Sequence, residues 1–191
     1  NQIFCLRLNI MVNFSDPKGV SMVTIDQANQ DFAQKVQSMD GGETLMLCFQ
    51  CGTCTASCPS GRLTAYKTRK LIRKAQLGLE DEVLSSPDLW MCTTCYSCME
   101  RCPRGVEIVD IITLLRNLAV EKGVMSAPHK KVGEMLVKFG ATVPLNSEYE
   151  DKREALGLAR KPANTLGDEK ALADVKKILK ATGFEDLVGG N

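Results

Sequence analysis

The amino-acid sequence predicts a mainly α-helical protein arranged around a small cysteine-rich centre. Two observations support this prediction: apolar residues recur at helical spacing in several segments, and eight of the nine cysteines fall into two blocks, at 48–58 and 92–102. At 191 residues with 44% apolar content, the chain fits one domain with extensions. We divide it into an N-terminal arm with a short helix (1–42), a cysteine-rich domain (43–125), and C-terminal helices with a linker (126–191).

Composition and charge exclude several broad classes of function. The net charge of +1 provides no excess of Lys and Arg to neutralise phosphates, and aromatic residues make up 5% of the chain, so no nucleic-acid binding is expected. The apolar stretch 3–12 is short and interrupted by Arg7, so we expect neither a secretory signal nor direct insertion into a membrane. We therefore expect a cytoplasmic protein, in which thiols stay reduced and clustered cysteines bind metal more often than they form disulfides.

The first 42 residues are expected to form an irregular arm followed by one short helix. Pro17 and Gly19 interrupt any pattern in residues 1–24. Asp26 can cap a helix that ends before the Gly41-Gly42 pair. The apolar residues of this helix at helical spacing are Ala28, Phe32, Ala33 and Val36.

The segment between the cysteine blocks predicts two helices of opposite charge. Residues 62–84 contain no proline and one glycine, Gly78. We expect a basic helix over 62–74 and a shorter acidic helix around Glu80-Asp81-Glu82. The basic helix is either a solvated face, a docking surface or a counter-charge for the cysteine blocks. Its cations are Arg62, Lys67, Arg69, Lys70, Arg73 and Lys74.

After the second block, the sequence predicts three more helices. The segment 106–122 carries one wide apolar stripe and is the strongest helix of the chain. A short helix is expected after Pro128, and residues 140–167 are interpreted as an extended linker with a helical turn near 152–158. Asp168 can cap a last helix, whose apolar face we expect to be buried against a partner subunit.

The two cysteine blocks are copies of one pattern, repeated at an offset of 44 residues. The first is Cys48-x2-Cys51-x2-Cys54-x3-Cys58-Pro, and the second is Cys92-x2-Cys95-x2-Cys98-x3-Cys102-Pro. This run is typical of two-cluster bacterial ferredoxins, in which the fourth cysteine binds the cluster held by the other run. Three closely spaced thiolates can bind three irons of a cube, whereas the fourth iron faces away from their loop.

The pattern therefore predicts two [4Fe–4S] clusters with exchanged fourth ligands. The expected ligands of cluster 1 are Cys48, Cys51, Cys54 and Cys102. The expected ligands of cluster 2 are Cys58, Cys92, Cys95 and Cys98. Each cluster then fastens both halves of the domain, which places the clusters near one another and suits a relay of electrons. The proline after each fourth cysteine is expected to turn the chain away and begin a helix.

Zinc binding and cysteine catalysis are alternative interpretations of the two blocks. Structural zinc sites take pairs of cysteines separated by a longer loop, whereas each block here is one run of four that ends in Cys-Pro. A catalytic cysteine needs a base, and the only histidine, His129, is expected at the surface in the turn after Pro128. The sequence therefore favours iron–sulfur clusters.

Several other residues are expected to support the clusters. Gly52 and Gly61 leave room for the chain to approach a cluster and for N–H groups to point at sulfur. An apolar shell that limits solvent around cluster 2 is expected from Trp90, Met91, Tyr96 and Met99. Cys5 lies outside both runs and is expected to be an ordinary thiol. Because the sequence shows no dinucleotide fingerprint, phosphate loop or acid–base pair, no catalytic residue is assigned.

The residues of both runs and of the flanking helices also carry a family resemblance. The first run reads Cys-Phe-Gln-Cys-Gly-Thr-Cys-Thr-Ala-Ser-Cys-Pro-Ser-Gly-Arg over 48–62, and the second reads Leu-Trp-Met-Cys-Thr-Thr-Cys-Tyr-x-Cys over 89–98. A helix containing Phe32 to Val36 precedes the first run, and a last helix ends in Thr-Gly-Phe. Over about residues 24–188, these features resemble the iron–sulfur C subunit of the CoB–CoM heterodisulfide reductases of methanogenic archaea.

The resemblance implies a fold, a function and a set of partners. The fold is an α-helical ferredoxin with at most small strands near the runs. In that family, the flavin-containing A subunit splits electron pairs, and the catalytic B subunit reduces the disulfide of coenzyme M and coenzyme B. The C subunit would relay single electrons from the flavin-containing to the catalytic subunit in methanogenesis, with an associated hydrogenase or formate dehydrogenase feeding the flavin. The catalytic subunit binds its clusters through Cys-Cys-Gly motifs, and this chain contains no Cys-Cys dipeptide.

Two other redox functions stay open at this point. One is the iron–sulfur subunit of a succinate- or glycolate-type oxidoreductase, which needs a membrane partner or Cys-Cys-Gly repeats. The other is a free-standing diffusible ferredoxin, although small ferredoxins are usually acidic and much shorter. Co-purifying subunits distinguish both from the favoured function. Metal analysis separates all three from a zinc-stabilised interaction module, because two cubanes require about eight irons and no zinc.

Overall fold

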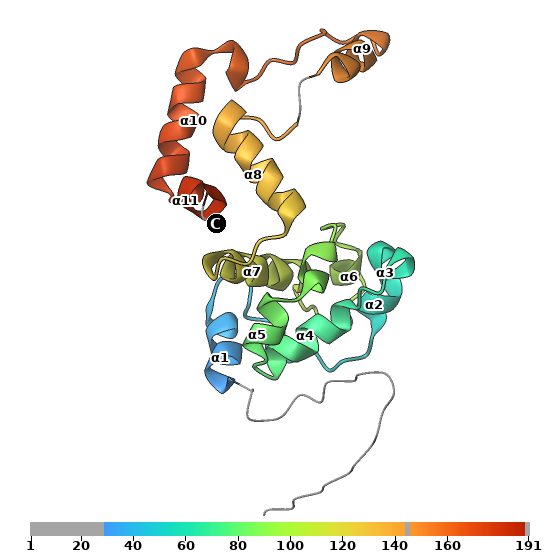
Figure 1. Ribbon diagram of the computed structural model, residues 1–191. Helices are drawn as coiled ribbons and strands as arrows, with labels where there is room; N and C mark the ends of the chain where they lie inside the picture. Colours follow the sequence, from blue (N-terminus) through green and yellow to red (C-terminus); the bar gives the residue numbers. More distant parts are fainter. Residues whose placement is uncertain (1–28, 144–145, 190–191) are drawn as a thin grey trace, which may run out of the picture.

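The computed structural model describes residues 29–143 and 146–189, and the regular structure of these residues is entirely helical. A lower body contains α1 to α7, and α8 to α11 form an arm that rises from it (Figure 1). The predicted irregular arm 1–24, Cys5 and the proposed cap Asp26 lie outside the described residues. Within the described part, no helix has both the length and the apolar character needed to cross a bilayer.

The helices follow one another closely along the chain. In the body they are α1 (Gln30–Ser38), the 3₁₀ helix η2 (Leu45–Leu47), α2 (Thr53–Ser57), α3 (Pro59–Leu63), α4 (Thr68–Gln76), α5 (Glu80–Leu84), the 3₁₀ helix η3 (Pro87–Met91), α6 (Ser97–Glu100) and α7 (Ile108–Glu121). In the arm they are α8 (Ala127–Phe139), α9 (Ser147–Ala155), the 3₁₀ helix η4 (Thr165–Gly167), α10 (Glu169–Ala181) and α11 (Phe184–Gly189).

Helix α7 forms the centre of the body, which confirms the long helix that the apolar stripe predicts. Ile111, Ile112 and Leu115 on this helix are fully buried. Around them pack Phe32 of α1, Leu89 of η3 and further apolar residues of α4, α5 and α6. Full burial of one such side chain contributes roughly 1.5–3 kcal/mol. The same core holds the loops that carry the cysteines.

Helix α1 begins later than the sequence predicts, because its cap is Asn29 rather than Asp26. The Asn29 side chain accepts a hydrogen bond from the backbone N–H of Asp31 at 3.1 Å. Its own backbone N–H donates to the carbonyl of Gly78 at 2.8 Å, and its amide donates to Glu80 at 3.1 Å. Either residue type can cap a helix. These long-range bonds, which the sequence does not reveal, fix the start of α1 at the turn between α4 and α5.

The predicted basic helix over 62–74 is wrong as one element, since the structure has two helices, α3 and α4, separated by residues 64–67. Thr64 ends α3: its hydroxyl donates to the Ser60 carbonyl at 2.9 Å and accepts from the backbone N–H of Tyr66 at 3.2 Å. A threonine that bonds to neighbouring backbone in this way competes with helix formation. The break directs Tyr66 into the interior, where it is 1% exposed.

The C-terminal arm contains more helix than the sequence predicts. The supposed linker holds the nine-residue helix α9, capped by Asn146, and Arg160 forms ion pairs with three of its carboxylates. The last helix is capped by Asp168 as predicted, and the additional helix α11 follows it. α10 and α11 pack on α8, so the apolar face that was expected to need a partner subunit is partly covered within the chain, although Ile178 stays 61% exposed.

Candidate iron–sulfur site

The eight cysteines of the two runs surround two small cavities. One cavity, here called cavity 1, is lined by Cys48, Cys51, Cys54 and Cys102. The other, here called cavity 2, is lined by Cys58, Cys92, Cys95 and Cys98. Each cavity takes three cysteines from one run and the fourth cysteine from the other run. This is the grouping of the two ligand sets that the sequence predicts.

The two runs share one backbone conformation. In each run, the second residue after the first cysteine is left-handed: φ is 68° at Gln50 and 51° at Thr94. Two residues further on, φ is 87° at Gly52 and 61° at Tyr96, immediately before the short helices α2 and α6. Non-glycine residues rarely adopt this conformation. Its recurrence at equivalent positions indicates that the loop needs it to curve around a cavity.

The loop of cavity 1 is held by a side chain from α4. The Nε2 atom of Gln76 donates to the carbonyl oxygen of Leu45 at 3.1 Å and to that of Cys48 at 2.8 Å. These two carbonyls belong to η2 and to the first cysteine of the run. Gln76 therefore fastens the start of the run to the helix beside it.

The loop of cavity 2 is held at the equivalent carbonyls by a different residue. Arg116, on α7, donates through Nε to the carbonyl of Leu89 at 2.9 Å and through Nη2 to that of Cys92 at 2.7 Å. Leu89 and Cys92 follow Leu45 and Cys48 at the repeat offset of 44 residues. The guanidinium also lies over the Trp90 ring, with Cζ 5.7 Å from the ring centroid. The repeat thus extends to the bonding of the loops, with a charged donor replacing an amide.

The fourth cysteine of each run accepts a backbone N–H at its sulfur. The N–H of Gly61 lies 3.4 Å from Cys58 Sγ, as expected for a glycine that lets the chain approach sulfur, and the N–H of Val106 lies 3.3 Å from Cys102 Sγ. After Cys58, proline begins α3 as predicted. After Cys102 the same prediction is wrong, because the chain makes a turn and the next helix begins at Ile108.

Hydroxyl groups lie beside the second cysteine of each run. Cys51 Sγ lies 3.3 Å from Thr53 Oγ1, and Cys95 Sγ lies 3.6 Å from Ser97 Oγ. These hydroxyl and backbone contacts lower the pKa of both exposed thiols, which favours the thiolate that binds iron. When the sulfurs are thiolates, the hydroxyls act as donors. One further contact is restricted to cavity 1, where Gln50 Nε2 donates to Cys48 Sγ at 3.3 Å.

The third cysteine of each run is buried where the two halves meet. Cys54 lies on α2 and Cys98 on α6, and these two helices pack against each other. Burial raises the pKa of the Cys54 thiol and raises that of Cys98 to about 12. A free thiolate is unfavourable at both positions, and coordination to iron removes that cost because the metal shares the charge. The two cavities are therefore neighbours across one helix contact.

Two further observations fit a [4Fe–4S] cube in each cavity. Each cavity has four thiols, yet among the described residues no three Cys, His, Asp or Glu side chains are grouped so as to hold a single metal ion. That separation suits a cube, in which each cysteine binds a different iron. Tyr66 also lines cavity 2, and its hydroxyl is, within the described residues, the buried side-chain polar atom without a hydrogen-bond partner. Such a group indicates a partner in the cavity.

The environment of the Tyr66 phenol keeps it protonated. Burial raises its pKa, and the charges of three cysteines of cavity 2 raise it further, whereas the nearby Thr68 opposes the rise. Although Thr68 is close, the phenol makes no hydrogen bond of normal geometry to it. Sequence patterns assign no role at the clusters to Tyr66, Gln76 or Arg116. Their roles depend on contacts between residues far apart in the chain, which periodicity does not encode.

Of the four residues expected to form an apolar shell around cluster 2, Tyr96 is the one that lines cavity 2. Trp90 and Met99 pack against the core, whereas Met91 and Tyr96 are exposed. His129 is exposed as expected, but it lies in the first turn of α8, where its ring packs against that of Trp90 in a tilted arrangement, with ring centroids 4.9 Å apart. This contact joins the arm to the loop of cavity 2. Partial burial lowers the pKa of His129, and the positive charge of Arg116 lowers it further.

A basic groove opens beside the first cysteine of cavity 1. Phe49 lies in it with 60% of its surface exposed, and Met46 and Leu47 are exposed on the preceding 3₁₀ helix. Its cationic lining consists of Lys67, Arg69, Lys70 and Arg73. Of these, Arg69 donates to the carbonyl of Gln50 at 3.4 Å, so it also supports the loop. No acidic residue lines the groove among the described residues.

Comparison with known proteins supports the iron–sulfur assignment. Residues 44–106 match the 4Fe-4S dicluster domain, so this part of the chain carries two [4Fe–4S] clusters. The chain is 52% identical over 163 residues to the C subunit of the H(2):CoB-CoM heterodisulfide,ferredoxin reductase of Methanothermobacter marburgensis, covering 85% of this chain and 88% of that protein. It is 46% identical over 176 residues to the iron-sulfur C subunit of the CoB--CoM heterodisulfide reductase of Methanopyrus kandleri, covering 88% and 92%. It is 49% identical over 147 residues to the C subunit of the Ferredoxin/F(420)H(2)-dependent CoB-CoM heterodisulfide reductase of Methanosarcina acetivorans, covering 77% and 91%.

Proposed function

The chain belongs to the family of iron–sulfur C subunits of the CoB–CoM heterodisulfide reductases, and on this premise we propose that it relays single electrons from the flavin-containing A subunit to the catalytic B subunit. The catalytic subunit would reduce the CoM-S-S-CoB disulfide, and this chain would contribute no catalytic residue. The names of relatives mention hydrogen, formate and ferredoxin. We therefore include in the proposal a hydrogenase or formate dehydrogenase that supplies electrons to the flavin. We also propose that the whole complex is located in the cytoplasm.

The observation that carries this proposal is the position of the two cavities in one small body. Cys54 of cavity 1 and Cys98 of cavity 2 lie on helices α2 and α6, which are in contact. We assign cluster 1 to Cys48, Cys51, Cys54 and Cys102, and cluster 2 to Cys58, Cys92, Cys95 and Cys98. The grouping of these cysteines around the two cavities supports the assignment. Neighbouring clusters suit a relay between a donor and an acceptor on other chains.

Anaerobic purification of the complex from the native cell tests this function. We expect a flavoprotein and a second protein with Cys-Cys-Gly motifs to co-elute with this chain, and we expect about eight irons per copy of it. A chain that elutes alone and exchanges electrons as a diffusible carrier contradicts the proposal and favours the ferredoxin alternative. A membrane-bound partner without Cys-Cys-Gly motifs favours the succinate-type alternative.

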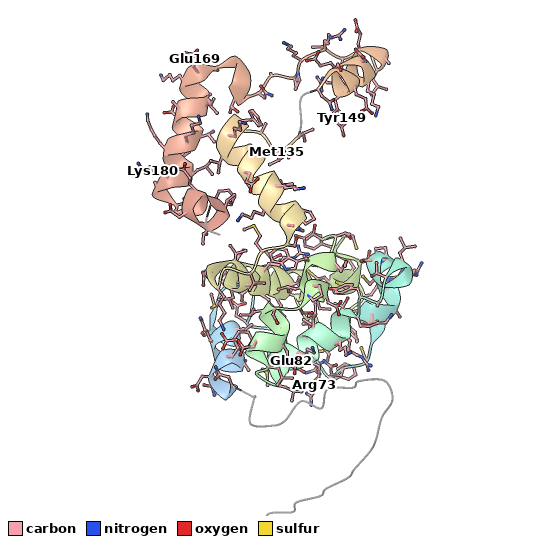
Figure 2. All side chains as sticks on the ribbon, viewed as in Figure 1. Arg73, Glu82, Met135, Tyr149, Glu169 and Lys180 are labelled. Carbon is pink, nitrogen blue, oxygen red and sulfur yellow. The ribbon has the colours of Figure 1, made fainter. Side chains whose placement is uncertain are left out.

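The basic groove is a suitable docking site for the acidic rim of a redox partner. It lies at the first cysteine of cavity 1, so a partner bound there is close to cluster 1. Its exposed Phe49 provides an apolar contact, and the surrounding cations provide charge complementarity. Arg73 lies at the lower edge of the body, opposite the arm that carries Lys180 (Figure 2). Of the uses that the sequence leaves open for these cations, we therefore favour docking.

Reversing charge in this groove is expected to weaken assembly of the complex. The double variant Lys67→Glu/Lys70→Glu replaces two exposed cations. Unlike Arg69, neither side chain forms a hydrogen bond that supports the loop of cavity 1. Placing like charges against an acidic partner costs up to several kcal/mol, so we expect affinity to fall about tenfold or more at low salt. The loss should shrink at high salt, because exposed charges are screened. Sedimentation or pull-down with the remaining subunits measures the change.

The matched control is Lys176→Glu/Lys180→Glu, which makes the same change of charge on exposed positions of α10. We expect this control to bind as the unaltered chain does. Equal weakening in both double variants would mean that net charge alone matters and would contradict a specific docking groove. Iron content, measured in parallel, should be unchanged in both.

A further inference from the structure

Tyr66 has a buried hydroxyl that nothing described in the protein satisfies. Its side chain is 1% exposed, and its Oη atom has no hydrogen-bond partner. Buried polar groups are nearly always paired, since an unpaired buried hydroxyl is destabilising. Tyr66 lies in the short connection between α3 and α4, and its side chain packs in the buried core rather than at the surface. The missing partner must therefore lie in the adjoining cavity.

That cavity is cavity 2. Tyr66 lines it together with Cys58, Cys92, Cys95 and Cys98. A neutral phenol has a hydrogen to donate, whereas thiolates and the sulfides of a cluster are acceptors that carry negative charge. Donation to charged sulfur is stronger than donation to a neutral acceptor. The chemistry of the hydroxyl and of the cluster is therefore complementary.

We propose that Tyr66 donates a hydrogen bond to a sulfur of cluster 2 and thereby raises the reduction potential of this cluster relative to cluster 1. The inference rests on the proposed assignment of the four cysteines of cavity 2 as cluster ligands. Reduction adds negative charge to the cluster, and a donor at sulfur stabilises the reduced form more than the oxidised form. Tyr66 is thus a positioning and tuning residue, which itself gains and loses no electron.

The two cavities differ at this point, although most of their contacts repeat. Cavity 1 has a side-chain donor at its first cysteine, where Gln50 Nε2 lies 3.3 Å from Cys48 Sγ. The equivalent position in the second run is Thr94, whose hydroxyl donates to the carbonyl of Thr93 at 2.7 Å instead. Cavity 2 therefore lacks the glutamine donor and has the buried phenol. Because the hydrogen-bond donors differ, the reduction potentials of the two clusters can differ as well.

The test is the variant Tyr66→Phe in the full chain loaded with both clusters, with potentials measured by a titration followed by electron spin resonance. Removing the oxygen keeps the ring and its packing. We expect the equilibrium constant for reduction of cluster 2 to fall about tenfold, a shift of about 59 mV for one electron, and cluster 1 to be unaffected. The signal of cluster 2 is identified as the one that Cys95→Ala removes. Iron content should stay at about eight per chain.

A second variant distinguishes the loss of a hydrogen bond from a defect in folding. Incorporation of a difluorinated tyrosine at position 66 makes the phenol a stronger donor without removing it, and the potential of cluster 2 should then rise. The control Tyr149→Phe removes the same atom from an exposed residue on α9, far from both cavities, and should change neither potential (Figure 2). Unchanged potentials in both Tyr66 variants, with eight irons bound, would overturn the inference. That result leaves the proposed relay intact, since the relay is tested by the subunits that co-elute.

Discussion

Replacing Cys102 by alanine is expected to remove cluster 1, although Cys102 belongs to the second run. The thiol of Cys102 lines cavity 1 together with the three cysteines of the first run. Losing one of four thiolate ligands leaves one iron without its protein ligand, which destabilises the cluster. We expect iron to fall from about eight per chain toward about four. The reciprocal variant, Cys58→Ala, is expected to remove cluster 2.

The exchange of ligands is measured by matching spectra between variants. Cys51 and Cys95 are unambiguous members of the first and the second run. The electron spin resonance spectrum of reduced Cys102→Ala should match that of Cys51→Ala, and the spectrum of Cys58→Ala should match that of Cys95→Ala. The opposite matches would show that each run keeps its own fourth cysteine. Cys5→Ala, outside both runs, is the control and should retain both clusters.

The second large effect is expected at Arg116. The variant Arg116→Met removes a charged donor from the carbonyls of Leu89 and Cys92 and leaves both without a partner in a partly buried site. A hydrogen bond to a charged group contributes about 1.5–3 kcal/mol, so we expect the free energy of unfolding to fall by about 3 kcal/mol. Cluster 2 should also be lost faster than cluster 1 when a chelator is added.

Gln76→Met and Arg153→Met complete this experiment. Gln76 holds the equivalent carbonyls at cavity 1 through an uncharged amide, so a smaller loss of about 1–2 kcal/mol is expected, with cluster 1 lost first. Arg153 lies on helix α9 and donates to the carbonyl of Ala159, so its replacement should have little effect on either cluster. Urea unfolding and chelator-driven bleaching measure both quantities. If Arg116→Met destabilised the two clusters equally, the carbonyl bonds would not be the cause.

Much of the site can be predicted from the sequence, because the binding of two clusters requires cysteines at a defined and repeated spacing. Every cysteine that lines the two cavities follows from one run of known spacing and its copy 44 residues later. Helix α7 was equally predictable, since an apolar stripe that continues over four helical turns is typical of a helix packed in a core. The cap at Asp168 followed from residue type and position alone. These features are all encoded over short stretches of chain.

The features that the sequence does not predict depend on contacts across the fold. The start of α1 is fixed by the bond between Asn29 and Gly78, and the division of the basic segment is fixed by the hydroxyl of Thr64. The residues that hold the loops, Gln76 and Arg116, do not share the offset of the repeat, so a search for copies misses them. Only the carbonyls that they bind are repeated.

The exchange of cysteines between the two cavities has a consequence for the making of the protein. While a ribosome is still translating this chain, its first run emerges long before Cys102 does, yet Cys102 lines the first cavity. Neither cavity has its full lining until the second run has been synthesised. Cluster insertion by the maturation machinery must therefore wait for the second run, and a truncated nascent product that stops before Cys98 has no complete set of four cysteines at either cavity.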